Sequence, residues 1–185
     1  MAFNVQQFRA SLQFDGARAS LFEVIMNLPP AAGFTAIDQE VRFKARATSL
    51  PGDNINSVSV PYFGREIKVA GTRTFPDWSF TVINDENFLI RNNLELWMSG
   101  LNSHVNNLRN PILATSNLYQ ADAYVTQFAK TGEPIKTYRI VGAFPTDVSA
   151  IDLDWSAGDQ IEEFSVTLSY QWWEAIAPFQ TTDVV

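Results

Sequence analysis

The chain has 185 residues, of which 46% are hydrophobic and 18% charged, which is typical of one ordered globular domain rather than a disordered segment. It contains no cysteine, so disulfides and thiolate chemistry are excluded. No apolar run approaches the length of a membrane span, and the first residues lack the basic-then-apolar pattern of a signal peptide.

The formal net charge of −7 is unevenly distributed along the chain. Residues 1–109 balance ten cations against ten carboxylates, whereas residues 110–185 carry three cations and ten carboxylates. A protein that grips DNA needs clustered cations to displace counterions from phosphate. The second half of the chain is therefore expected to form either an ordinary solvated surface or one that does not hold nucleic acid.

The first third of the chain is expected to contain an arm and two strands. Residues 1–19 scatter apolar side chains among polar ones, which suits a short helix or an arm docked on a neighbouring copy. Residues 20–28 predict a strand that ends at two prolines. Residues 40–50 alternate apolar and polar side chains, which predicts a strand with three cations on one face, namely Arg42, Lys44 and Arg46. No aromatic residues accompany these cations on that face, so they are weak evidence for a nucleic-acid site. If copies assemble side by side, we expect these cations to pair with carboxylates from the C-terminal half of a neighbour.

Residues 51–64 are expected to form a projecting hairpin or loop, because a Pro-Gly-Asp-Asn turn cluster precedes a weak alternation. A tight turn is predicted at residues 70–72, before a strand at residues 78–82. A helix is then predicted over about residues 86–101, capped by Asn84 and Asp85. Its apolar stripe has spacings of four, three and four: Ile90, Leu94, Trp97 and Leu101.

After a loop at residues 104–117, four further strands are predicted at residues 121–128, 135–144, 150–155 and 161–173. The expected fold is mainly β: an antiparallel sandwich or barrel with one flanking helix, in a single domain over residues 1–185 with a C-terminal extension at residues 174–185. In the last strand, Ser165, Thr167 and Ser169 form a small polar face. This face suits ordinary solvated sheet or the smooth wall of a pore.

Candidate catalytic chemistry is sparse. His104 is the only histidine, which excludes zinc sites built on histidine pairs. Asp152 and Asp154 share one side of their predicted strand, where they can hold Ca²⁺, act as a glycosidase pair or simply keep an edge strand soluble. Trp172 and Trp173 face opposite sides of a strand, so one is expected in the core and one at a contact. We predict no catalytic residue, no metal and no cofactor.

Several segments carry a family resemblance in their order and spacing. They are residues 44–51 (KARATSLP), 69–78 (VAGTRTFPDW), 84–86 (NDE), 142–148 (GAFPTDV), 153–155 (LDW), 164–168 (FSVTL) and 172–174 (WWE). Across about residues 21–174 these segments resemble the tail tube proteins of contractile-tailed phages.

The resemblance implies hexameric rings, in which strands from each copy join one barrel around a lumen, stacked into a tube for the genome. The implied partners are other copies, the tail sheath protein, baseplate and terminator proteins, and phage DNA in transit without specific binding. The implied location is the virion tail, after assembly in the host cytoplasm. The expected inter-subunit contacts are Pro51, Asn54, Ile55, Val58, Val60, Tyr62, Phe63, Arg42, Lys44, Arg46 and Trp173, and the expected lumen-facing residues are Ser165, Thr167, Ser169, Asp152 and Asp154.

Other functions remain open at this point. A carbohydrate- or receptor-binding β-sandwich would use the tryptophans and the two aspartates, and a glycosidase would use the aspartates alone. A tube of a secretion system or bacteriocin would keep the same architecture and carry effectors or nothing.

Overall fold

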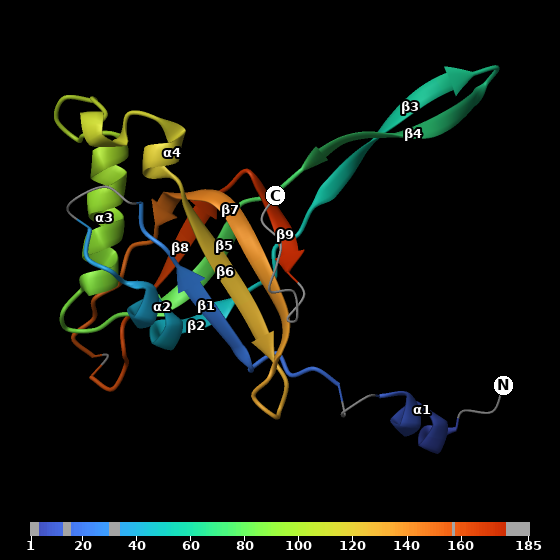
Figure 1. The fold of residues 1–185 in the computed structure, drawn as a ribbon, viewed down its shortest axis with the longest axis horizontal. Helices are drawn as coiled ribbons and strands as arrows, with labels where there is room; N and C mark the ends of the chain where they lie inside the picture. Colours follow the sequence, from blue (N-terminus) through green and yellow to red (C-terminus); the bar gives the residue numbers. More distant parts are fainter. Residues whose placement is uncertain (1–3, 13–15, 30–33, 157, 177–185) are drawn as a thin grey trace.

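The computed structural model describes residues 4–12, 16–29, 34–156 and 158–176, and its body is a strongly curved antiparallel sheet with a helix beside it (Figure 1). The strands are β1 (Phe22–Met26), β2 (Ala45–Thr48), β3 (Asn54–Tyr62), β4 (Arg65–Thr74), β5 (Trp78–Ile83), β6 (Ala121–Phe128), β7 (Pro134–Val148), β8 (Glu163–Ser169) and β9 (Trp172–Ile176). The helices are α1 (Val5–Ser11), α2 (Asp38–Lys44), α3 (Leu89–Leu101), the 3-10 turn η2 (Pro111–Leu113) and α4 (Ser116–Tyr119). The predicted mainly β, antiparallel fold is confirmed. None of the described helices is long and apolar enough to cross a bilayer.

The long strand β7 organises the body. The main sheet has the order β1-β6-β7-β8-β5-β2, and β9 also pairs with β7. The first half of β7 lies between β6 and β9, whereas its second half pairs with β8. Gly142, with φ of 67°, stands at the change of partners. Asp122 fixes this point, because its Oδ1 accepts from the Gly142 backbone N–H at 3.1 Å and its Oδ2 accepts from Arg139 Nη2 at 2.7 Å.

The core lies inside this curve, against the apolar stripe of α3. The predicted stripe is confirmed for Ile90, Leu94 and Trp97, which are buried, and Leu101 packs against the core. The Trp97 Nε1 donates to the Tyr119 carbonyl at 2.9 Å, so a buried indole still has its hydrogen-bond partner. The largest fully buried side chains are Trp78, Trp97, Phe80, Phe164, Met26, Ile37, Leu94, Ile140 and Leu168.

The start of α3 differs from the prediction. The helix begins at Leu89, and its N-cap residue is Phe88 with φ of 50°. The Asn84 side chain donates instead to Glu162 Oε2 at 2.8 Å, and Asp85 pairs with Lys44. Neither predicted residue is the N-cap of α3, because tertiary partners bind both side chains, although a hydrogen bond from the Leu89 backbone also helps to lower the pKa of Asp85.

The predicted strand over residues 40–50 was also wrong in its first half. Residues 38–44 form α2, and only residues 45–48 form β2. Ile37 and Val41 are buried four residues apart, which is a helical spacing, whereas Phe43 is exposed. Asp38 lies near the positive end of this helix and Lys44 near its negative end, as the helix dipole favours.

Two turns fall elsewhere than predicted. Residues 70–72 lie inside β4, and the hairpin turns at Phe63 and Gly64, whose φ values are 43° and 78°. Residues 150–155 form no strand and belong to the exposed loop between β7 and β8. The predicted strand over residues 161–173 is split: β8 ends at Ser169 and β9 pairs with β7 instead, after the Gln171 N–H donates to the Val141 carbonyl at 3.0 Å.

Both ends of the chain were expected to lie outside the body. A short helix, α1, is present in the predicted arm, and it lies apart from the body (Figure 1). Asn4 caps it, with Oδ1 accepting from the Gln6 backbone N–H at 3.0 Å. The predicted extension begins within β9, and its residues 177–185 lie outside the described part of the chain. The loop predicted at residues 104–117 contains η2 and the first residues of α4.

Candidate assembly surfaces

The hairpin of β3 and β4 (residues 54–74) extends from the body as a two-stranded ribbon (Figure 1). Val58 stands opposite Val69, and Val60 opposite Ile67, so these four side chains share one face. Each is about half exposed, and Phe63 at the turn is 93% exposed. An isolated two-stranded hairpin is at best marginally stable in water, so this apolar face suits burial against another molecule.

The root of the hairpin is held by aromatic side chains of the body. The Ser49 carbonyl accepts from Trp78 Nε1 at 2.7 Å, and the Gly52 carbonyl accepts from Trp173 Nε1 at 3.0 Å. The Tyr170 hydroxyl also donates to Gly52, at 3.4 Å. Burial raises the pKa of Tyr170, so its phenol keeps the proton it donates. The ribbon therefore leaves the body in a fixed direction.

The predicted contact residues of this region separate into two groups. Those that lie exposed on the hairpin are Asn54, Ile55, Val58, Val60, Tyr62 and Phe63. Pro51 is buried at the root. Trp173 packs against the core and edge-on to Tyr138, with ring centroids 5.4 Å apart. Sequence reasoning placed Pro51 and Trp173 at an interface, whereas their side chains are used within the subunit. Trp172 is the more exposed tryptophan of the pair, at 48%.

The predicted cationic stripe does not exist as one face. Arg42 and Lys44 lie on α2 and Arg46 on β2, and each pairs within its own chain. Arg42 Nε lies 2.9 Å from Glu23 Oε2, and Arg46 pairs with Glu163. The expected partners were carboxylates of a neighbour, so this expectation is corrected.

Lys44 bridges two carboxylates, Glu40 and Asp85, within the subunit. Burial alone would lower the pKa of Lys44, but its hydrogen bonds with Asp85 and Glu40 outweigh burial and raise that pKa. The same hydrogen bond from Lys44 lowers the pKa of Asp85. This cluster therefore joins α2 to the segment before α3.

A hydroxyl-rich face covers β8 and β5 on the side away from the core. Ser165, Thr167 and Ser169 alternate with the buried Phe164, Val166 and Leu168. By register, Thr81 stands opposite Ser165 and Ser79 opposite Thr167, and the Thr81 and Ser165 hydroxyls lie 3.4 Å apart. Asp147 of β7 also pairs with Thr167, which adds a carboxylate to this side.

Asp152 and Asp154 do not join the hydroxyl-rich face. They lie in the exposed loop between β7 and β8, rather than on one side of a strand, so the geometry argued for them as a pair is corrected. The Asp154 Oδ1 accepts from the Ser156 backbone N–H at 2.9 Å and from its hydroxyl at 2.8 Å, which lowers the pKa of Asp154. No group of three metal-ligating side chains occurs among the residues that the structure describes.

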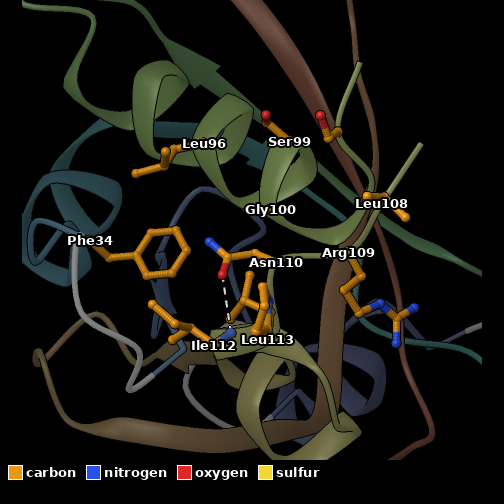
Figure 2. Close-up of a pocket in the computed structure, with 11 residues that line it drawn as sticks. Phe34, Leu96, Ser99, Gly100, Leu108, Arg109, Asn110, Ile112 and Leu113 are labelled. Carbon is orange, nitrogen blue, oxygen red and sulfur yellow. Dashed lines mark hydrogen bonds between the residues drawn. The ribbon is translucent and has the colours of Figure 1, made fainter. Parts of the chain in front are cut away.

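An open groove of about 450 Å³ runs between α3 and the segment that leads into η2 (Figure 2). Its walls are mainly apolar, and the Asn110 side chain in its lining accepts from the Ile112 backbone N–H at 3.0 Å. Lining residues include Phe34, Leu96, Gly100, Leu108, Arg109 and Leu113. None of them was singled out from the sequence, and Leu108, Arg109 and Leu113 fall in the stretch that was predicted only as a loop.

The family model for phage tail tube protein matches residues 7–176, almost the whole described chain. The chain belongs to this family. Tail tube protein gp19 of Enterobacteria phage T4 is 34% identical over 167 residues, which cover 90% of this chain and 96% of the relative. Tail tube protein gp19 of Enterobacteria phage T6 is 33% identical over 167 residues, which again cover 90% of this chain and 96% of the relative.

A solved tube structure confirms the fold of this tail tube protein. It is a chain of an extracellular contractile injection system, described as a PVC sheath-tube complex in the extended state, and it matches with a TM-score of 0.58 and 13% identity. The match covers 95% of this chain and 99% of that one. The predicted family and the structural tube role are thus confirmed.

The sequence analysis did not identify the hydrogen-bonding groups that hold the root of the β3–β4 hairpin in this tail tube protein. Trp78, Tyr170 and Gly52 hold the root through hydrogen bonds, and the sequence analysis assigned no such role to any of the three. The signal was present in the indole and phenol groups, because buried Trp and Tyr require a polar partner. Which carbonyl would supply it depends on tertiary structure.

Proposed function

We propose that copies of this protein form hexameric rings that stack through the β3–β4 hairpin into the tube of a contractile phage tail. The single observation that carries the proposal is the hairpin itself, whose apolar face has no cover among the described residues of its own chain. Head-to-tail stacking repeats without limit, which is how a tube grows from identical rings.

Lateral closure of the ring is supported by the margins of the sheet. Among the described strands, β1, β2 and β9 each pair with one neighbour only. An unpaired strand edge is a template for pairing with another chain, and closing a barrel across subunits removes such edges. We infer that some of these edges meet between neighbours in a ring.

We further propose that the hydroxyl-rich face lines the lumen, with Ser165, Thr167 and Ser169 toward the passing genome. Short hydroxyls solvate a polymer without gripping it, and Asp147 disfavours phosphate close to the wall. Screening over about 8 Å in physiological salt confines this repulsion to near contact. Asp152 and Asp154 are left out of this wall because they lie in the β7–β8 loop.

The proposed partners beyond other copies are the tail sheath protein, baseplate and terminator proteins, and phage DNA in transit. The proposed location is the virion, after assembly in the host cytoplasm. The role is structural rather than enzymatic.

Negative-stain microscopy of the purified protein tests this function. We expect sixfold rings and long tubes from the wild-type chain. Replacing residues 54–74 by a short Gly-Ser linker is geometrically mild, since Asn54 and Thr74 stand opposite each other. It should leave folded subunits or rings that do not stack. A wild-type chain that stays monomeric at every concentration contradicts the tube function, and long tubes from the linker variant contradict the role of the hairpin.

A further inference from the structure

The β7–β8 loop (residues 149–162) exposes large apolar side chains at the surface. Trp155 is fully exposed, Leu153 is 81% exposed and Ile161 is 69% exposed. Single apolar residues are common on surfaces, but three in one loop, with an indole among them, are typical of a contact site. An aromatic side chain supplies much contact area at low entropic cost.

Both ends of the loop are tied to the body by backbone hydrogen bonds. The Ser149 N–H donates to the Ser165 carbonyl at 2.9 Å, and the Glu162 carbonyl accepts from the Asn84 N–H, just after β5, at 2.8 Å. Asp154 caps the turn through Ser156, immediately beside Trp155. The indole is therefore presented to solvent by a defined turn, which lowers the cost of ordering it on binding.

Charge indicates which surface fits this loop. The loop contains four carboxylates and no cation, namely Asp152, Asp154, Asp159 and Glu162. The hairpin contains three cations and one carboxylate: Arg65, Lys68, Arg73 and Glu66. Arg73 pairs with Asp53, whereas Arg65 and Lys68 are exposed and have no ion pair within the described chain. Two loops would repel each other, as would two hairpins, so the charges favour one loop against one hairpin.

The hairpin and the loop lie at opposite ends of the molecule (Figure 1). The hairpin points to the upper right of the view, while the orange-red loop between β7 and β8 lies at the lower left, near the lower end of α3. One copy therefore cannot bring the two together. A contact between them joins different copies head to tail, which is the geometry that generates open stacks.

We propose that the hairpin of one copy docks on the β7–β8 loop of a second copy in the next ring. Trp155 and Leu153 cover the apolar hairpin face of Val58, Val60, Ile67 and Val69. The loop carboxylates lie beside Arg65 on that face, and Lys68 on the opposite face adds to the positive charge of the ribbon. This inference rests on the proposed tube function and names the second half of its stacking contact.

The contact between the loop and the hairpin is tested by reversing the charges on each side separately and then on both sides together. Asp152 and Asp159 are exposed and have no hydrogen-bond or ion-pair partner within the described chain, so D152K/D159K leaves the subunit intact. This variant alone, and R65E/K68E alone, should form rings but lose tubes. The four changes in one chain restore attraction between the reversed loop and the reversed hairpin, so tubes should return. Tube fraction is measured by sedimentation and negative stain at low and physiological salt.

Trp155→Ala tests the apolar part, with Phe43→Ala on α2 as the control at another exposed aromatic residue that lies on neither proposed contact surface. We expect the loop variant to raise the concentration needed for tube growth about tenfold or more, as for loss of an aromatic hot spot, and the control to leave it unchanged. Circular dichroism verifies that both variants fold.

Three outcomes overturn the proposal. Normal tubes from both D152K/D159K and W155A show that the loop is solvated, and the tube function then stands with another partner for the hairpin. Loss of rings in these variants places the loop at the lateral contact. If the variant with all four charge reversals does not restore tubes, the proposed charge pairing between loop and hairpin is wrong. The absence of rings and tubes from the wild-type chain contradicts the proposed function itself.

Discussion

The indole nitrogen of Trp173 lies 3.0 Å from the carbonyl oxygen of Gly52, which joins the last strand to the root of the hairpin. Gly52 is followed directly by the segment that enters β3, so this hydrogen bond helps to set the direction in which the ribbon leaves the body. Trp173 was expected to contact a neighbouring copy. Its observed contact instead positions the β3–β4 hairpin, which is the element proposed to make that contact.

Trp173→Phe keeps an aromatic ring against Tyr138, removes the donor to Gly52 and reduces the indole to a smaller phenyl ring. We expect a loss of about 1 kcal/mol in the free energy of unfolding. We also expect faster amide hydrogen exchange at the hairpin root and fewer tubes at a given protein concentration. Trp172→Phe is the matched control, because Trp172 is half exposed and has no hydrogen-bond partner for its indole among the described residues. Equal exchange in the two variants would show that the Gly52 contact does not hold the root.

Gly142 supports a second prediction, at the place where β7 changes partners. A Cβ at this position would lie 3.0 Å from Gln171 Cγ and 3.1 Å from Gln120 Oε1, on a backbone with φ of 67°. Gly142→Ala therefore combines backbone strain of about 1 kcal/mol or more with a steric shift of two side chains. The free energy of unfolding in urea should fall by about 2 kcal/mol.

Gly132 provides the control for this change. Its φ is 86°, and a Cβ there would meet nothing within 4 Å, so Gly132→Ala isolates the backbone cost. The difference between the two variants measures the packing at the bend of β7. If both lose the same free energy, the neighbours of Gly142 adapt freely and the bend is not tightly packed.

The Lys44–Asp85 pair gives a stability difference that depends on pH. The pKa of Asp85 is lowered in the folded state, so its stabilisation is complete above the ordinary carboxyl value and is lost as pH falls through the folded pKa. The pKa of Lys44 is raised, so its share is complete below its ordinary value and is lost as pH rises beyond it. Asp85→Asn should therefore cost most on a plateau between about pH 5 and pH 10.

The size of this plateau is expected to be about 1 kcal/mol or less, because both side chains remain partly exposed to water. Urea unfolding at a series of pH values measures it. Glu86→Gln is the control, since this neighbouring exposed carboxylate has no partner in the described chain and carries the same charge change. A cost for Asp85→Asn that is unchanged at pH 3 would assign the effect to packing rather than to charge.

The sequence predicted those parts of the fold in which one face of an element is buried by its own chain. The α3 stripe of Ile90, Leu94 and Trp97 and the buried face of β8 follow directly from periodicity. The order of the family segments also identified the tube family correctly. These features depend on local spacing, which a sequence displays.

The errors have a common physical cause in partners that are remote in sequence. Residues 40–44 alternate as a strand would, yet they belong to helix α2, whose buried residue is Val41 and whose charges suit its dipole. Residues 151–155 alternate too, but Leu153 and Trp155 are exposed, and the alternation serves no internal core. An alternating pattern predicts a strand when its apolar side chains pack on the core of the same chain. An exposed loop with apolar side chains, such as residues 151–155, can show the same alternation, so the sequence alone does not distinguish the two.

The hydroxyl-rich face allows a direct test of the proposed lumen. Thr167→Lys with Ser169→Lys adds two cations to each copy, on the side of β8 away from the core. If this face surrounds the lumen, sixfold rings concentrate twelve added charges around one channel, and such rings should retain short double-stranded DNA. Retention should fall steeply between about 50 and 200 mM salt, because phosphate binding releases counterions. Co-sedimentation of labelled DNA with purified rings measures it.

Two controls make the lumen test specific. Thr167→Gln with Ser169→Gln enlarges the side chains without charge and should leave DNA unbound. Thr131→Lys with Glu133→Lys adds lysines to the exposed turn between β6 and β7, outside the proposed wall, and changes the charge of each copy by three units against two for the wall variant. A closed channel concentrates the electrostatic potential of its lysines, whereas an outer surface does not. This variant should therefore bind DNA more weakly and with a shallower salt dependence. Equal retention by the two lysine variants would mean that β8 does not face an enclosed lumen.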